Sequence, residues 1–173
     1  KCGPLLIKHP NTDLNSSSKI AIPGKYTTAN LLLSHFNPEF SNKRELIFSD
    51  IEDQILLGHV DAGLIIHENR FTYEQKGLEK VKDLGESWEK ETGLPIPLGG
   101  IVVKRTIPSQ IQQKLQRVLR SSVEYAFKNR KSSSDFIRSH AQSMEKHVID
   151  SHINLYVNDY SISLGTEGRK AVK

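Results

Sequence analysis

The chain has 173 residues, of which 36% are hydrophobic and 25% charged, a size that allows one core, or one domain with part of another. It holds no apolar run near the roughly 18 residues of a membrane span, so we expect no membrane partner. The net charge of +4 is spread over the chain, with Lys and Arg interleaved with Asp and Glu. A nucleic-acid-binding face needs a basic stripe with aromatic residues, so we expect no nucleic-acid partner either.

The first residues of the chain bear on its disulfide chemistry and completeness. Cys2 is the only cysteine, so the chain can form neither an internal disulfide nor a cluster of thiolate ligands. The charged, apolar and cleavage-site segments of a secretory leader are not present, so secretion has no support in these residues. Residues 1–7 have the pattern of a turn that runs into a strand, without an initiator Met. We therefore expect that residues upstream of Lys1 are missing.

Short apolar runs in the first two thirds of the chain are typical of buried strands. A polar stretch at residues 11–18 separates the first two runs and is expected to be an exposed loop. We predict strands at residues 5–7, 19–24, 46–48, 62–67, 81–85 and 97–104.

Helical segments alternate with these strands. Thr27 or Thr28 can cap a short helix through residues 31–36. Ser49 and Glu52 have the spacing of a capping box before a helix through residues 55–57. A third short helix is predicted at residues 88–92.

The final third of the chain is predicted to be helical. Ser109 and Gln112 have capping-box spacing directly after Pro108, and apolar residues then keep helical spacing as far as Phe127. Three serines at residues 132–134 are expected to end this helix. Further helices are predicted after residue 134, through residues 148–156 and from residue 165.

The alternation of strands and helices predicts an α/β fold, with a mainly parallel sheet flanked by helices. Ligands in such folds bind beyond the carboxyl ends of the strands. Polar segments follow three of the predicted strands, at residues 23–28, 49–50 and 67–68. We expect these segments to line a cleft.

The Thr27-Thr28-Ala29 segment is the first candidate binding element. A helix that starts here offers free backbone N–H groups, two hydroxyls and the positive end of the helix dipole, which together suit a carboxylate or a phosphate. The alternative is a plain threonine cap with no ligand, which is a common feature of helices.

His67 is the candidate catalytic residue. It ends an apolar strand and precedes Glu68, and near neutral pH an imidazole at this place could accept or donate a proton. The alternative is a strand-end histidine that is hydrogen-bonded to a loop.

Other chemistry has less support. The remaining histidines show no zinc-ligand spacing, so we expect no metal site. Gly99-Gly100 lacks the spacing of a dinucleotide or phosphate loop, and neither fingerprint occurs elsewhere in the chain. There is no nucleophile elbow, and Cys2 in its Gly-Pro turn fits a structural role at least as well as a catalytic one.

Four blocks in this order resemble the 1,4-dihydroxy-6-naphthoate synthase family of the futalosine route to menaquinone. The resemblance extends from Cys2 to the C-terminal helices. The blocks are Gly24-Lys25-Tyr26-Thr27-Thr28-Ala29-Asn30, Asp61-Ala62-Gly63-Leu64-Ile65-Ile66-His67-Glu68, Asp83-Leu84-Gly85-Glu86 with Trp88 and Glu89, and Thr92-Gly93-Leu94-Pro95-Ile96-Pro97-Leu98-Gly99-Gly100-Ile101.

The resemblance implies a two-lobed fold like that of type 2 periplasmic binding proteins, used in the cytoplasm. It implies a lyase that converts cyclic dehypoxanthine futalosine, a small-molecule carboxylate, to 1,4-dihydroxy-6-naphthoate without a metal or organic cofactor. It also implies that Thr28 and Ala29, with Thr27 beside them, bind the substrate, and that His67 is the catalytic base.

The chain departs from the family pattern in two ways. Nothing matches the family's first strand and its loop rich in Ser, Pro, Asn and Asp, and Asn69 stands where a glycine is expected. We therefore expect residues 1–18 to be a crossover from an absent N-terminal lobe, residues 19–103 to form the α/β lobe with the ligand loop, and residues 104–173 to form helices that pack on the lobes. One lobe would then be incomplete, and these 173 residues alone would be inactive.

Three other functions stay open. A solute-binding protein shares the two-lobed fold and binds without chemistry. The related chorismate dehydratase of the same pathway has a similar fold, although the His-Glu and Leu-Gly-Gly blocks resemble it less. A purely structural module would need neither His67 nor the threonines.

Overall fold

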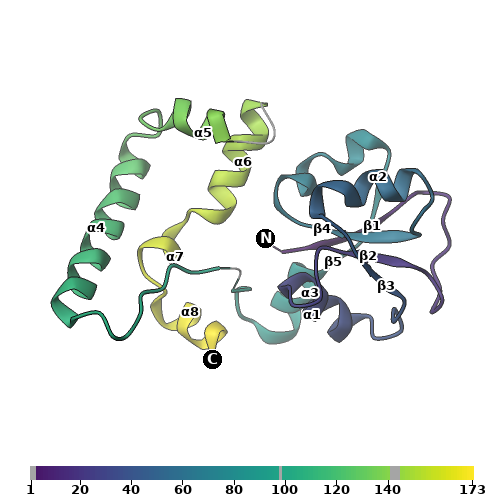
Figure 1. Ribbon diagram of the computed structural model, residues 1–173, viewed down its shortest axis with the longest axis horizontal. Helices are drawn as coiled ribbons and strands as arrows, with labels where there is room; N and C mark the ends of the chain where they lie inside the picture. Colours follow the sequence, from purple (N-terminus) through teal and green to yellow (C-terminus); the bar gives the residue numbers. More distant parts are fainter. Residues whose placement is uncertain (1–2, 98, 141–144) are drawn as a thin grey trace. The chain divides into compact units, whose positions relative to one another are not determined.

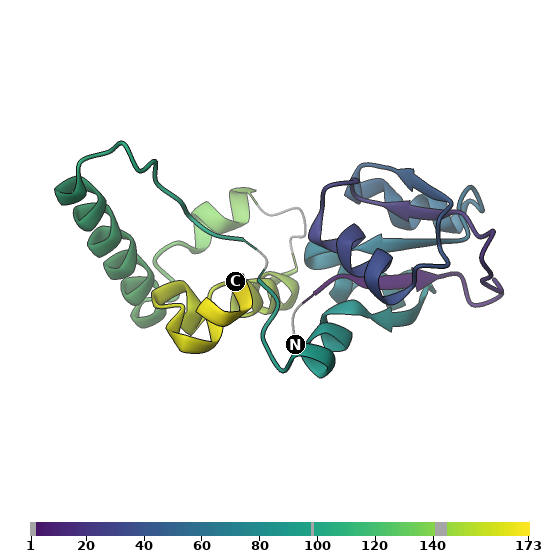
Figure 2. The same cartoon turned by 90° about the horizontal axis from the view of Figure 1, so that it is seen from below.

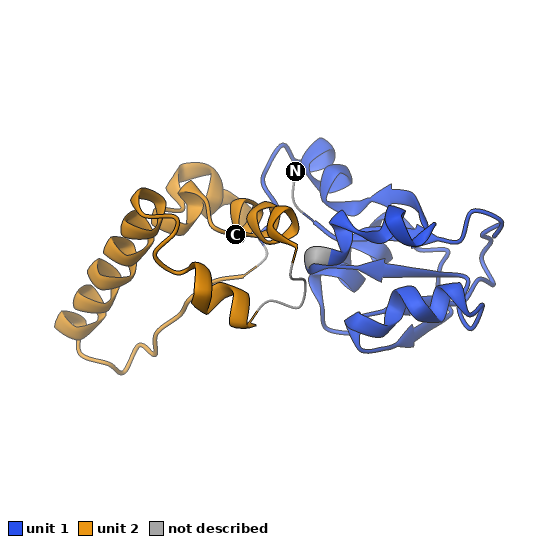
Figure 3. Ribbon diagram, turned by 90° about the horizontal axis from the view of Figure 1, so that it is seen from above, with its two compact units in different colours: residues 1–98 blue, residues 99–173 orange. Residues whose placement is uncertain are grey.

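The computed structural model describes residues 3–97, 99–140 and 145–173, with only the backbone at Glu68 (Figure 1). The chain divides into two compact units, Lys1–Leu98 and Gly99–Lys173 (Figure 3). Unit 1 contains the sheet and every residue of the predicted site. Unit 2 is helical in the part that the structure describes.

Unit 1 is built on a five-stranded mixed sheet in the order β3-β2-β4-β1-β5. β2 runs parallel to its neighbours β3 and β4, whereas β1 runs antiparallel to β4 and β5. Four strands therefore point the same way, and β1 alone is reversed among them. The strands are β1 (Leu5–Lys8), β2 (Ile20–Ile22), β3 (Lys43–Glu45), β4 (Ala62–Ile65) and β5 (Glu79–Asp83).

Helices cover both faces of this sheet. Figure 1 shows α1 (Thr28–Phe36) and α3 (Leu84–Thr92) on one side and α2 (Ile51–Leu56) on the other. Successive strand residues point to opposite faces, so neighbouring residues enter different cores. Leu6 packs in one cluster with residues of α1 and α3, while Leu5 and Ile7 pack in the other with residues of α2. Three short 3-10 helices complete the unit, η1 (Phe48–Asp50), η2 (His67–Phe71) and η3 (Tyr73–Lys76).

Two glycines of unit 1 allow close packing. A Cβ on Gly63 would overlap the side chain of Ile51, because α2 lies directly on β4. A Cβ on Gly3, whose φ is +153°, would overlap the backbone of Gly85 at the start of α3. Both positions therefore exclude larger side chains for steric reasons.

Two predictions between residues 43 and 52 were wrong. The strand is Lys43–Glu45 rather than residues 46–48, because β3 lies at the sheet edge, where charged side chains reach solvent. The capping box of Ser49 and Glu52 is not formed, since α2 has no side-chain cap and Glu52 is fully buried.

Two further predictions were wrong near the start of unit 2. In the segment 97–104, no described residue lies in a strand. The long helix begins at Ser109 with Pro108 as its N-cap, which has no hydroxyl to offer. Gln112 instead donates a hydrogen bond of 2.6 Å to the carbonyl of Ile107.

The other predicted helices of unit 2 are present, and one further short helix, α7 (Asp159–Ile162), was not predicted. Figure 2 shows α4 as a long helix at one side of the unit, and it contacts α7. Arg130, after α4, donates a 2.8 Å hydrogen bond to Asn154 of α6. Among the described helices, none combines the length and apolar character needed to cross a membrane. The helices are α4 (Ser109–Lys128), α5 (Ser134–His140), α6 (Lys146–Tyr156), α7 (Asp159–Ile162) and α8 (Gly165–Val172).

Candidate functional site

The carboxyl ends of the strands bring the predicted site residues to one edge of the sheet. β2 and β4 are adjacent and parallel, so the segments that follow Ile22 and Ile65 leave the sheet on the same side. β3 ends there too, and because β1 is reversed, β1 begins where β5 ends, with Leu5 opposite Asp83. We call this side, with residues 23–28, 46–50 and 66–71, the carboxyl edge.

Thr27 is the N-cap of α1. Its φ and ψ are −99° and 152°, and its hydroxyl accepts a 3.2 Å hydrogen bond from the N–H of Asn30. The same hydroxyl donates at 2.7 Å to the carbonyl of Gly24. Both contacts hold the turn between β2 and α1. The structure therefore places the Thr27 hydroxyl in a capping role, the simpler of its two interpretations.

Thr28 and Ala29 form the first turn of α1. Thr28 is half-buried, and the methyl group of Ala29 is buried in the core. Their backbone N–H groups precede the first intrahelical hydrogen bonds, and no described residue accepts from them. The first turn carries no acidic side chain that would neutralise the helix dipole. What α1 offers to an anion is therefore two N–H groups and the Thr28 hydroxyl.

His67 opens η2 directly after β4, in an uncommon backbone conformation. Its φ is +59°, and it is the one non-glycine residue with positive φ among the described residues. Such a conformation costs about 1 to 3 kcal/mol and persists only where the surroundings enforce it. The half-buried imidazole lies edge-on to the Phe48 ring, with 5.0 Å between the centroids. The loops after β3 and β4 thus meet at the carboxyl edge.

The third predicted segment, residues 49–50, lies in η1 beside Phe48. Ser49 donates a 2.9 Å hydrogen bond to the carboxylate of Asp50, and both residues are exposed. The segment is thus at the carboxyl edge, although its polar groups pair with each other.

Sequence reasoning missed a buried carboxylate that supports the loop after β4. Glu52 of α2 has no exposed surface, and its Oε2 accepts hydrogen bonds from Asn69 at 2.6 Å and from Lys76 at 2.7 Å. A buried charge is costly unless it is paired in this way. A glutamate among the buried residues Ile51 and Ile55 was the available signal, but its capping-box spacing suggested another role.

A second polar contact holds the same loop from its other side. Arg70 donates to the carbonyl of Gly3 and, at 2.9 Å, to the carboxylate of Asp83. Both side chains of this ion pair are largely buried, at 12% and 9% exposure. Asp83 also caps α3 by accepting from the N–H of Glu86 at 2.9 Å. The Asp83 carboxylate therefore joins η2 to α3, and Arg70 also reaches the segment before β1.

Tyr73 lies just beyond this loop and is buried at 6% exposure. Burial raises the pKa of Tyr73 to about 12, and the hydrogen bond that its hydroxyl donates to Glu74 adds to the effect. The phenol is therefore neutral near pH 7 and belongs to the core.

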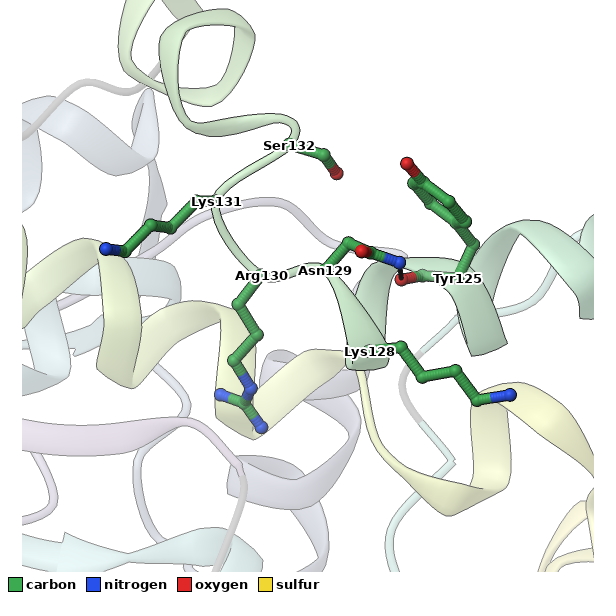
Figure 4. A pocket seen from close by; sticks show the side chains of 6 residues that line it. All are labelled: Tyr125, Lys128, Asn129, Arg130, Lys131 and Ser132. Carbon is green, nitrogen blue, oxygen red and sulfur yellow. Dashed lines mark hydrogen bonds between the residues drawn. The ribbon is translucent and has the colours of Figure 1, made fainter.

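Unit 2 contains an open hollow that is lined by basic residues where α4 ends (Figure 4). Asn129 folds back to donate a 3.0 Å hydrogen bond to the carbonyl of Tyr125. None of the predicted site residues lines it. The lining residues are Tyr125, Lys128, Asn129, Arg130, Lys131 and Ser132.

The described ranges hold no set of metal ligands. Within them, no three His, Cys, Asp or Glu side chains lie close enough together to hold a metal ion.

Solved structures place the fold among the periplasmic-binding-protein-like proteins. A protein of Archaeoglobus fulgidus superposes with a TM-score of 0.91 at 32% identity, over 99% of this chain and 64% of that chain. The ligand-binding component of an ABC-type import system from Staphylococcus aureus gives 0.59 at 15% identity, over 87% and 55%. The second likeness shows the fold alone.

Two proteins that share one name are similar to this chain in sequence. A protein of Thermus thermophilus named 1,4-dihydroxy-6-naphthoate synthase is 40% identical over 98% of this chain and 62% of its own length. A protein of the same name from Streptomyces coelicolor is 38% identical over 99% and 63%. The chain thus spans less than two thirds of the length of these relatives. The profile of the family described as Menaquinone biosynthesis matches residues 1–173. The chain therefore belongs to the Menaquinone biosynthesis family.

Proposed function

We propose that the full-length protein is a 1,4-dihydroxy-6-naphthoate synthase, a lyase that acts on cyclic dehypoxanthine futalosine in the cytoplasm without a metal or organic cofactor. Two relatives carry this name at 38–40% identity. The observation that supports the proposal most strongly is the adjacency of β2 and β4. It brings the start of α1 and the imidazole of His67 to the same edge of the sheet.

The start of α1 is the proposed site for the substrate carboxylate. The N–H groups of Thr28 and Ala29 point out of the helix N-terminus, where the dipole favours negative charge. The Thr28 hydroxyl adds a third donor. In this proposal Thr27 contributes through the turn that it caps rather than by direct contact, since its hydroxyl already pairs with Gly24 and Asn30.

His67 is the proposed base. Opening the ring of the substrate requires removal of a proton from a carbon next to a carbonyl, and a neutral imidazole can accept that proton near pH 7. A histidine held in a left-handed conformation at a strand end is typical of a residue placed for function rather than for packing.

A solute-binding protein is the second candidate. The fold likeness to the Staphylococcus aureus import component favours it, and an anion site at α1 would serve binding as well as catalysis. The two candidates differ in what they require of His67. A binding protein needs no proton acceptor, so replacing the imidazole would leave its chemistry unchanged.

The test is turnover of cyclic dehypoxanthine futalosine by the full-length wild type and by His67→Asn. Asparagine tolerates positive φ better than most residues, so this variant removes the base with little backbone change. His59→Asn is the matched control, since His59 is an exposed histidine of the same unit that bonds Gln54. We expect product from the wild type and from the control. The turnover rate of His67→Asn should be lower by about a hundredfold or more. Absence of product from the wild type would remove the assignment.

A further inference from the structure

We propose that Asn69 and Glu52 form a positioning pair, which holds η2 so that His67 keeps its left-handed conformation at the carboxyl edge. The inference rests on the proposed function, because it takes His67 as the base. Neither residue is given direct contact with substrate. Both act through the backbone that carries the imidazole.

The backbone conformation of His67 needs an anchor. His67 is a non-glycine residue at φ +59°, and a free loop would relax from this conformation. The ring contact with Phe48 restrains the imidazole but not the backbone. Side chains of η2 that bond outside the loop restrain its backbone, and Asn69 makes such a contact two residues after His67.

A partly buried hydrogen bond between Asn69 and Glu52 provides this anchor. Asn69 donates a 2.6 Å hydrogen bond to the Oε2 atom of Glu52, seventeen residues earlier in the chain. Glu52 has no exposed surface and sits on α2, whose neighbours Ile51 and Ile55 fix it in the core. Its carboxylate neither caps α2 nor faces solvent. Of its described partners, Asn69 lies within η2 and Lys76 is the last residue of η3.

Side chains of η2 hold the loop on both sides. Next to Asn69, Arg70 reaches the opposite way to Asp83 and to the carbonyl of Gly3. The consecutive side chains of Asn69 and Arg70 therefore bind η2 to α2 on one side and to Gly3 and Asp83 on the other. With residues 69 and 70 fixed, and β4 fixed up to Ile65, the backbone of His67 has little freedom.

The test uses full-length protein with Asn69→Ala, with Asn37→Ala as matched control. Asn37 makes a 2.9 Å hydrogen bond of the same kind to Glu39, far from η2 in the sequence. Misplacing a catalytic group by about 1 Å costs on the order of a hundredfold in rate. We expect Asn69→Ala to lower kcat by about ten- to a hundredfold with KM changed by less than about threefold. Asn37→Ala should leave both constants unchanged.

A pair swap separates positioning from general damage. Asn69→Asp keeps the size of the side chain but sets two carboxylates against each other, so kcat should fall at least as far as in Asn69→Ala. In the double variant with Asn69→Asp and Glu52→Gln, the amide at position 52 donates to the carboxylate at position 69, which reverses the wild-type bond. Lys76 still lies beside a carboxylate. We expect the double variant to recover most of the lost kcat. A double variant no better than Asn69→Asp would overturn the proposal.

A second readout does not depend on activity. The ring C–H signal of His67, assigned by its loss in His67→Asn, should shift or broaden in Asn69→Ala and stay in place in Asn37→Ala. An unmoved signal in Asn69→Ala overturns the positioning role, whatever the rates are. If the wild type makes no product but the signal moves as expected, the proposed function fails and the anchoring of His67 stands.

Discussion

The imidazole of His67 lies edge-on to the ring of Phe48, with 5.0 Å between the centroids and 61° between the planes. This contact joins the loop after β3 to the loop after β4, although nineteen positions separate the residues in the sequence. It therefore links the proposed base to η1, the short helix directly before α2. A double-mutant cycle with Phe48→Leu and His67→Asn should give a coupling of about 0.5 to 1.5 kcal/mol in the free energy of unfolding. Additive effects in urea denaturation would show that the contact contributes nothing.

Thr27 should matter for stability through its cap. Thr27→Ala removes the acceptor of the Asn30 N–H and should lower the free energy of unfolding by about 1 kcal/mol, whereas Thr27→Ser keeps the hydroxyl and should lose much less. Denaturant titration of both variants measures the difference. Equal losses in the two would argue against the capping role.

Gly63 should tolerate no side chain. A Cβ added at this position would overlap Ile51 and crowd Ile55 and Ala21. Gly63→Ala should therefore destabilise unit 1 by about 1 to 3 kcal/mol. Gly99→Ala is the control, because nothing lies within 4 Å of the Cβ that it would add. Thermal unfolding of the two variants compares them directly, and equal melting temperatures would contradict the close packing of α2 on β4.

Tyr73 gives a prediction at alkaline pH. Its pKa is raised from 10.0 to about 12 by burial and by its bond to Glu74. The unfolded chain releases this proton near pH 10 while the folded chain keeps it, so the free energy of unfolding falls as the pH rises from about 10 to about 12. Below that window the contribution is complete. In Tyr73→Phe the fall should be smaller, and the late tyrosinate absorbance of the wild type should disappear. An unchanged absorbance titration in that variant would contradict the assignment.

Local patterns were enough to predict most of the elements and the cap of α1. Apolar runs identified β1, β2 and β4, and the cap of α1 was predicted at Thr27 or Thr28, of which the structure has Thr27. These features depend on neighbouring residues alone. The reversed direction of β1 could not be predicted, since no local pattern specifies which strand it pairs with. The edge strand at Lys43–Glu45 lacked an apolar signal because its side chains face solvent.

The contacts that hold the loop under His67 could not be predicted from the sequence, because they join residues far apart in the chain. Glu52 meets partners seventeen and twenty-four residues away, and Arg70 meets Gly3 across sixty-seven. Burial of a carboxylate depends on those distant partners. The sequence placed Thr28, Ala29 and His67 at strand ends, but it contained no sign of how the loop under His67 is held. Their roles in binding and catalysis stay predictions.

The central claim is that the start of α1 binds a carboxylate beside His67. The most direct test is a crystal structure of the full-length protein with 1,4-dihydroxy-6-naphthoate bound. We predict that the carboxylate accepts hydrogen bonds of about 2.7 to 3.1 Å from the N–H groups of Thr28 and Ala29, with the ring system beside the imidazole. A naphthoate bound away from the carboxyl edge, for example at Lys128 and Arg130 of unit 2, would contradict the claim.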